Sequence, residues 1–237
     1  MQYDLIETET EDAFLDKATS ILEKQIGKAL SKAGRCTLCL AGGSTPLPVY
    51  QRLATRPIDW GNVWIYLADE RYVAPDHPDS NQRAIRETLV NPVALPPDHF
   101  IAPDTWKPLE ECVNLYEAAL KDLLSRGPTD VAILGMGEDG HVGSLFPPLS
   151  KDAFETSICA LRTHTDTFAV SERITVTVPV LVNAEVPVLL LRGRLKKRAW
   201  TQMMEGPMDP AQWPALSLLA TGRCSVVAQW IPSPTEE

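Results

Sequence analysis

Residues 130–147 read DVAILGMGEDGHVGSLFP, and this stretch is the most informative part of the chain. Its apolar run, VAIL, is typical of a buried strand, and it stops abruptly at Gly135. A glycine-rich turn follows and places Asp139 and His141 two residues apart. In α/β proteins, the groups that follow the carboxyl end of a strand lie where ligands bind. The stretch therefore predicts a strand that delivers a base to the carboxyl edge of a sheet.

Residues 36–50 read CTLCLAGGSTPLPVY, a second apolar run that breaks into a turn. Pro46 fits the first position of a helix, where its missing N–H costs nothing, and Ser44 or Thr45 would be the N-cap. Glycine lets the backbone approach a ligand, and a helix N-terminus offers free N–H groups to a phosphate. The alternative is a plain strand-to-helix turn, because neither GxxxxGK[ST] nor GxGxxG is present. The predicted phosphate-binding residues are Gly42, Gly43, Ser44 and Thr45.

Size and charge limit the classes of partner. A chain of 237 residues with 22% charged side chains is an ordinary globular protein, and we expect one domain over residues 1–237. A net charge of −9 argues against nucleic acid and anionic membranes as partners, although a small anionic substrate responds to the local field of its pocket. No apolar stretch reaches the ~20 residues that span a bilayer, and no signal peptide is recognisable. We expect a cytoplasmic protein with a frayed tail over residues 231–237; the oligomeric state is not predicted.

The five cysteines favour core packing over metal or redox chemistry. Cys36 and Cys39 form a CxxC, but the pair lies in a predicted strand, where residues three apart point to opposite faces. No second CxxC and no cluster of histidines accompanies it. We therefore expect buried cysteines and no metal site.

Strand and helix patterns alternate along the chain. Thr8 and Glu11 are placed to form a capping box for the first helix, and Gly34 is a natural end. The alternation predicts an α/β fold, with a mostly parallel, doubly wound, Rossmann-like sheet and helices on both faces. Helices are expected over 11–33, from Pro46 to Leu53, and over 80–91, 108–125 and 195–204. Strands are expected over 36–41, 63–68, 131–134, 174–178, 186–191 and 225–230.

Charged residues follow the predicted strand 63–68 directly. Asp69, Glu70 and Arg71 are costly to bury unless they are paired or used. The Arg71 guanidinium suits a phosphate or a polarised carbonyl. Ser80 is a suitable N-cap for the next helix, and capping alone is the alternative for Ser80 and Asn81. We expect His77 and His99 to be solvated and assign no role to His164.

Two further cations lie near strand ends. Lys196 falls in the first turn of a predicted helix, where a cation opposes the helix dipole unless an anion is bound beside it. This makes Lys196 the better phosphate candidate, whereas Lys197 and Arg198 fit a solvated face. Arg173, just before the strand 174–178, is a further candidate.

The segments GGSTP, ADERYVAPDHPDSN, LGMGEDGHVGSLFP, RIT and GRLKKRAW resemble those of the 6-phosphogluconolactonase family in order and spacing, from about residue 41 to residue 200. The resemblance implies a fold related to the glucosamine-6-phosphate deaminase and ribose-5-phosphate isomerase group. It also implies hydrolysis of 6-phosphoglucono-1,5-lactone to 6-phosphogluconate, in the oxidative pentose phosphate pathway, with no metal or organic cofactor. One departure is that Trp230 is followed by Ile-Pro-Ser, where the family often has a Trp-x-x-Asp segment.

Two alternatives differ from a lactonase in chemistry. The related deaminases carry a Glu five residues after the histidine, where this chain has Phe146, and a Tyr where it has Arg71. A sugar-phosphate sensor would keep the phosphate turn but lose the base. Lactone hydrolysis needs a base to activate water and an acid to protonate the leaving oxygen. One histidine, His141, can do both in sequence. Asp139 or Asp69 would orient its ring.

Overall fold

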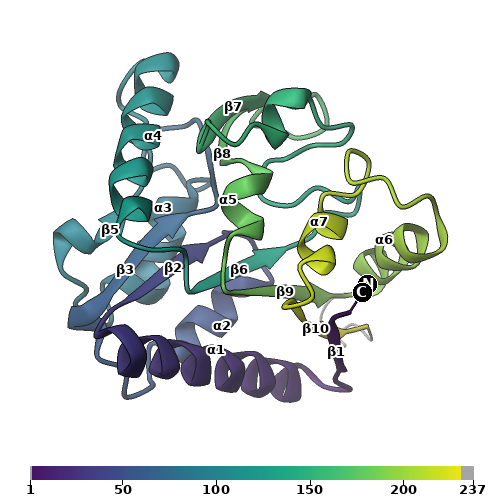
Figure 1. Ribbon diagram of the computed structural model, residues 1–237, viewed down its shortest axis with the longest axis horizontal. Helices are drawn as coiled ribbons and strands as arrows, with labels where there is room; N and C mark the ends of the chain where they lie inside the picture. Colours follow the sequence, from purple (N-terminus) through teal and green to yellow (C-terminus); the bar gives the residue numbers. More distant parts are fainter. Residues whose placement is uncertain (1, 231–237) are drawn as a thin grey trace.

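The computed structural model describes residues 2–230, and its centre is a seven-stranded sheet of order β1-β10-β9-β6-β2-β3-β5 (Figure 1). All neighbouring strands of this sheet run parallel. The prediction of a parallel sheet is confirmed. The strands are β1 (Asp4–Glu7), β2 (Cys36–Leu40), β3 (Val63–Leu67), β5 (Phe100–Ile101), β6 (Val131–Gly135), β9 (Val186–Arg192) and β10 (Ser225–Gln229).

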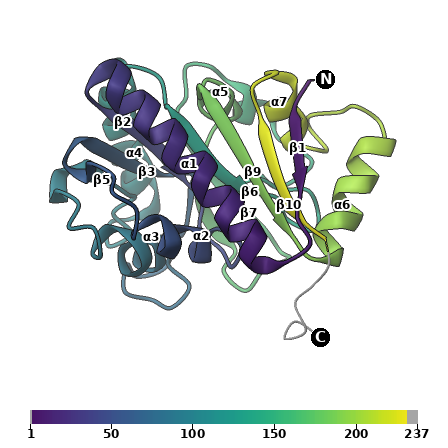
Figure 2. The same cartoon turned by 90° about the horizontal axis from the view of Figure 1, so that it is seen from below.

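Helices cover both faces of this sheet, as predicted. One face packs against α1 (Glu11–Ala33), α2 (Pro46–Leu53) and α3 (Asn81–Ile85). The other packs against α4 (Leu109–Ser125), α5 (Val178–Val182), α6 (Arg194–Glu205) and α7 (Ala215–Ala220). Figure 1 shows α1 below the sheet and α4, α5 and α7 above it, and Figure 2 shows α1 lying obliquely across the strands. Shorter helical turns are Trp60–Asn62, Arg86–Val90, Pro97–His99 and Lys151–Phe154.

The side chains of each central strand alternate between the two core clusters, because successive residues of a strand face opposite ways. Cys36 belongs to the α1 side, and Cys39 belongs to the α4 side. Burial raises the pKa of both thiols, that of Cys39 to about 12. Both therefore behave as small core residues, as the sequence predicted.

Within residues 2–230, no helix combines the length and apolar character needed to cross a membrane.

A second sheet of three antiparallel strands lies beyond the carboxyl ends of the parallel strands, in the order β4-β8-β7. Its strands are β4 (Asp69–Arg71), β7 (Ala160–His164) and β8 (Glu172–Val176). The strand predicted over 174–178 was therefore misplaced, because Val178 begins α5, with Pro179 in its first turn. The polar segment 69–71 was not predicted as a strand, since its residues pair through a partner distant in the chain.

Three local predictions need correction. The N-cap of α1 is Thr10, whose side chain accepts the N–H of Ala13, whereas the hydroxyl of Thr8 donates to the carbonyl of Ala228 on β10. Thr45 occupies the N-cap position of α2 without a side-chain capping bond. His99 is half-buried and stacks on Trp64, with ring centroids 3.9 Å apart, so it is not simply solvated.

Glu70 joins β4 to the start of α3. Its Oε1 accepts the backbone N–H groups of Arg71 and Asn81, both at 2.7 Å. Its Oε2 accepts the Gln82 N–H at 2.7 Å and the Ser80 hydroxyl at 3.1 Å. Burial raises the pKa of Glu70 to about 7, while the backbone donors favour its charged form. A fully buried carboxylate with donors on both oxygens holds α3 against the small sheet.

We expect Glu70→Gln to lower the free energy of unfolding by about 3 kcal/mol, because either amide orientation turns an NH₂ group toward two donors. Urea denaturation in buffer more alkaline than the Glu70 pKa measures this loss. The matched control is Glu87→Gln, which removes only the exposed pair with Arg83 and should cost about 0.5 kcal/mol or less. Equal losses in the two variants would contradict the anchoring role.

Candidate active site

The order of the parallel sheet reverses between β2 and β6. From β2 the chain adds β3 and β5 on one side, and the later strands β6, β9 and β10 extend the sheet on the other. At such a switch point the connections that leave the two strands diverge, and a crevice opens at their carboxyl ends. A cavity of about 340 Å³ lies there, between the turn that follows β2 and the turn that follows β6.

The cavity brings together most of the residues that the sequence singled out. Asp139 is not on its wall but lies behind His141. Asn81 and Phe168 are among the lining residues that had not been assigned to a site: capping alone was the alternative considered for Asn81, and no local pattern marks Phe168. The predicted residues on the wall are Gly42, Gly43, Ser44, Thr45, Asp69, Arg71, His141, Arg173 and Lys196.

Asp139 is the carboxylate that contacts the imidazole. Its Oδ1 lies 2.5 Å from His141 Nδ1 and also accepts the His141 backbone N–H at 3.3 Å. Burial acts to raise the pKa of Asp139, but the hydrogen bond and charge of His141 outweigh it, so the pKa is lowered. The carboxylate therefore stays ionised and occupies Nδ1, which leaves Nε2 of His141 as the nitrogen available for a ligand.

Gly137 makes room for this pair. A Cβ at residue 137 would overlap the His141 ring and lie 2.5 Å from Asp139 Oδ1. The Gly137 N–H instead donates to the His141 carbonyl at 2.7 Å, which closes the turn. Only glycine allows the backbone to pass so close beneath the two side chains.

Asp69 bonds to Ser144 and not to His141, which was considered as its partner from the sequence. Its Oδ2 accepts the hydroxyl of Ser144 at 2.6 Å, and no bond to His141 is present within the described residues. The Asp69 carbonyl accepts the Asn81 amide at 3.0 Å, and a Cβ on Gly42 would overlap that amide. Asp69 is nearly buried, and it lines the cavity.

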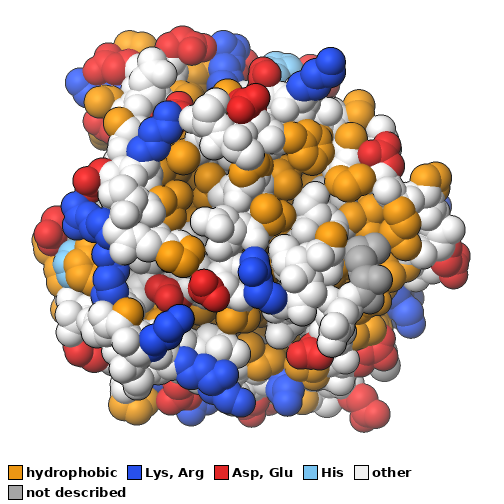
Figure 3. Space-filling model, in the orientation of Figure 1, with side chains coloured by type: hydrophobic (Ala, Val, Ile, Leu, Met, Phe, Trp, Pro, Cys, Tyr) orange, Lys and Arg blue, Asp and Glu red, His pale blue; other side chains and the backbone are white. Residues whose placement is uncertain are grey.

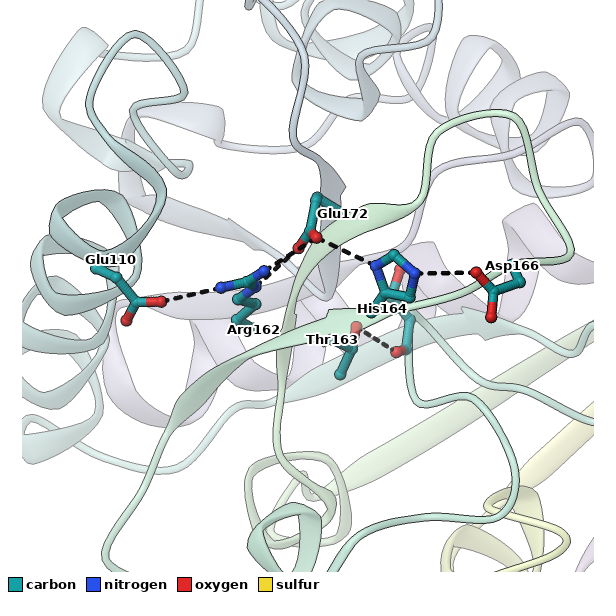
Figure 4. Close-up of polar contacts among 7 residues, drawn as sticks. Glu110, Arg162, Thr163, His164, Asp166 and Glu172 are labelled. Atoms are coloured by element: carbon teal, nitrogen blue, oxygen red, sulfur yellow. Dashed lines mark hydrogen bonds and ion pairs between the residues drawn. The ribbon is translucent and has the colours of Figure 1, made fainter.

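His164 offers a contrast on the surface of the small sheet, where it lies between two carboxylates (Figure 4). Its Nε2 is 3.1 Å from Asp166 and its Nδ1 is 3.1 Å from Glu172, which also pairs with Arg162. The hydrogen bonds with Asp166 and Glu172 raise the pKa of His164. Because both ring nitrogens are occupied, His164 has no free nitrogen with which to act as a base.

Three cations face the cavity from separate elements. Lys196 donates from Nζ to the carbonyl of Met136, and burial lowers its pKa. Arg71 and Arg173 are directly opposite each other on β4 and β8. Burial, and then the charge of Arg71, lower the pKa of Arg173. Like charges held opposite each other in a sheet are unfavourable unless an anion binds between them, so the wall is suited to an anionic ligand.

This cationic wall contrasts with the rest of the surface. The chain carries a net charge of −9, and Figure 3 shows basic and acidic side chains interspersed around the margin of the face in view. Lys197 and Arg198 are exposed, as predicted for a solvated face. Within residues 2–230, no group of three or more His, Cys, Asp and Glu residues is arranged to hold a metal ion. Attraction of an anion therefore depends on the local cations of the cavity.

Known proteins share the sequence pattern and the fold of this chain. A family model described as glucosamine-6-phosphate isomerases/6-phosphogluconolactonase matches residues 9–226. A Dictyostelium discoideum protein named probable 6-phosphogluconolactonase is 34% identical over 219 residues, covering 91% of this chain and 93% of its own. The crystal structure of 6-phosphogluconolactonase from Thermotoga maritima matches with a TM-score of 0.84 at 27% identity, covering 97% of this chain and 100% of that chain. A monomeric glucosamine-6-phosphate deaminase shares the fold, with a TM-score of 0.83 at 22% identity and coverage of 95% and 97%.

The fold and the cavity define an α/β protein with a cation-lined cavity at a switch point of its sheet. The chain belongs to the family of glucosamine-6-phosphate isomerases and 6-phosphogluconolactonases. The resemblance seen in the sequence is thereby confirmed, and so is the predicted relation of the fold to the deaminases. The departure after Trp230 concerns residues 231–237, which lie outside the described residues, as does the expected frayed tail.

We expect Gly137→Ala to separate His141 from Asp139, because the added methyl group overlaps both side chains. The accompanying loss of stability should be about 1–3 kcal/mol, as for other overpacking changes. A crystal structure gives the Nδ1–Oδ1 distance, and thermal unfolding gives the stability. Gly135→Ala is the matched control, since the nearest atom to its Cβ would be 3.9 Å away. An unchanged pair in Gly137→Ala would refute this account of the turn.

Proposed function

We propose that the protein hydrolyses 6-phosphoglucono-1,5-lactone to 6-phosphogluconate, with His141 as the general base. The observation that carries the proposal is an imidazole held by Asp139 at Nδ1, with its second nitrogen at a cavity that also holds the glycine-rich turn and three cations. The names of the relatives point to the same substrate. We also propose that residues 1–237 form one domain and that the protein acts in the cytoplasm.

The substrate's phosphate binds at the turn that follows β2. The N–H groups around Gly43, Ser44 and Thr45 lie at the start of α2, and Gly43 has a φ of 100° that favours glycine. Lys196 also lines the cavity and supplies a positive charge. Arg71 adds charge at the phosphate or polarises the lactone carbonyl, and Arg173 supports it from the neighbouring strand.

The chemistry then needs a single base. Nε2 of His141 takes a proton from water as the water oxygen attacks the lactone carbonyl carbon. Backbone N–H groups of the 135–140 turn, or Arg71, stabilise the tetrahedral oxyanion. As the bond from that carbon to the ring oxygen breaks, the imidazolium returns the proton to the ring oxygen. Asp139 stabilises the imidazolium between these two steps.

The position of Phe146 favours this reaction over that of a deaminase. Ring opening and proton transfer between two carbons need a further acid–base group, which the deaminases carry as a Glu at this position. Here Phe146 packs against His141, with ring centroids 5.0 Å apart. An apolar ring at this position removes that acid–base group, which hydrolysis of a lactone does not need.

We expect His141→Asn to lower lactone hydrolysis by roughly 10²–10⁴-fold, because water loses its base. The lactone is generated in situ from glucose 6-phosphate by its dehydrogenase, and the spontaneous rate is subtracted. Binding of 6-phosphogluconate, measured by calorimetry, should be retained. His164→Asn is the matched control, since that histidine also contacts a carboxylate but does not line the cavity.

An equally active His141→Asn variant would move the base elsewhere, to Asp69 first. A wild-type protein that binds 6-phosphogluconate but hydrolyses the lactone no faster than buffer would refute the lactonase and favour a sugar-phosphate sensor.

We expect the affinity for 6-phosphogluconate to fall as pH rises toward the ordinary lysine pKa of 10.5. Burial lowers the pKa of Lys196, so its charge is lost at a lower pH than that of a free lysine. The phosphate itself keeps a constant charge above its second pKa of about 6. Lys196→Arg should lose less affinity over this range, whereas the exposed control Lys197→Arg should follow the wild type. Parallel losses in all three proteins would exclude Lys196 as the phosphate ligand.

A further inference from the structure

Phe168 lies on the connection between β7 and β8 and reaches the cavity from a part of the chain that no motif had marked. Its side chain is 39% exposed, and it lines the cavity. The connection is compact, because the Thr165 N–H donates to the Ser171 carbonyl at 3.0 Å and Thr167 N–H to the Thr165 hydroxyl at 3.2 Å. Phe168 is thus presented by a short, closed loop.

The ring of Phe168 meets the imidazole edge to face. Its centroid is 5.5 Å from that of His141, with an interplanar angle of 79°. Phe146 contacts the same imidazole at 5.0 Å and 55°, and lies 5.8 Å from Phe168. These distances are within the range of favourable aromatic pairs. The two phenyl rings therefore restrict rotation of the imidazole about its side-chain bonds.

Arg173 completes this group of side chains. Its guanidinium carbon lies 5.9 Å from the centroid of Phe146 and 5.8 Å from that of Phe168. Its Nε donates to the Val170 carbonyl of the same loop at 2.8 Å. Arg173 is nearly buried, and its cation–π contact holds the partly exposed Phe168 ring in place.

Asp139 alone leaves the imidazole incompletely oriented. Its bond to Nδ1 fixes one point of the ring, whereas delivery of a proton by Nε2 also requires the plane of the ring to be set. Phe146, which follows β6, and Phe168, on the connection between β7 and β8, supply that second restraint. We propose that Phe168 is a positioning residue, which acts through His141 and not by binding the substrate; this inference rests on the proposed function.

The test combines kinetics with crystal structures. Phe168→Ala should lower kcat by about 10- to 100-fold while the Kd of 6-phosphogluconate changes less than about threefold, because a displaced base affects the reaction and not the binding. Its crystal structure should show the imidazole rotated or its Nδ1–Oδ1 contact lengthened. Phe168→Tyr, which keeps the ring edge, should restore both kcat and the geometry.

The matched control is Phe154→Ala, since Phe154 is 37% exposed and does not line the cavity. It should keep the wild-type kcat. A Phe168→Ala variant with the wild-type kcat and imidazole orientation would overturn the inference. A rise in Kd with an unchanged kcat would also overturn it and make Phe168 a binding residue. If the wild type fails to hydrolyse the lactone, the proposed function fails, and the imidazole orientation in the two crystal structures decides the role of Phe168 independently.

Discussion

The reversal of strand order between β2 and β6 is the constraint on which the rest of the structure depends. Parallel strands need crossover connections, and these leave β2 and β6 toward opposite sides of the sheet. The divergence opens a cavity that the helices do not fill. The groups proposed to contact the substrate reach that cavity from strand ends, turns, the first turn of α6 or the small antiparallel sheet.

The small sheet completes a site that the parallel sheet leaves open. β4 continues directly from β3 and turns Asp69 and Arg71 toward the cavity, while β8 adds Arg173 beside Arg71. Glu70, between these two residues, points the other way and holds α3. Alternation along one short strand therefore separates a structural carboxylate from the residues of the cavity.

The balance between burial and hydrogen bonding sets the pKa values of the charged groups of the site. Asp139 stays ionised because its bond to His141 outweighs the cost of desolvation, whereas Lys196 and Arg173 have lowered pKa values because burial dominates. The cations are therefore held at a cost that a bound anion would offset. His164, on the surface, shows the opposite case, in which solvent and two carboxylates favour its charged form.

Much of the fold and site could be predicted from the sequence, because those features are local. Short continuous apolar runs predicted β2, β3, β6 and β9, and the spacing of Asp139 and His141 placed both on one turn. The sequence did not predict the pairing of Arg71 with Arg173, the choice of Ser144 as partner of Asp69, or the contact of Phe168 with His141. A sequence pattern records which residues become buried, but not against which distant segment. Only the packing of β4, β7 and β8 onto the carboxyl edge of the parallel sheet decided those contacts.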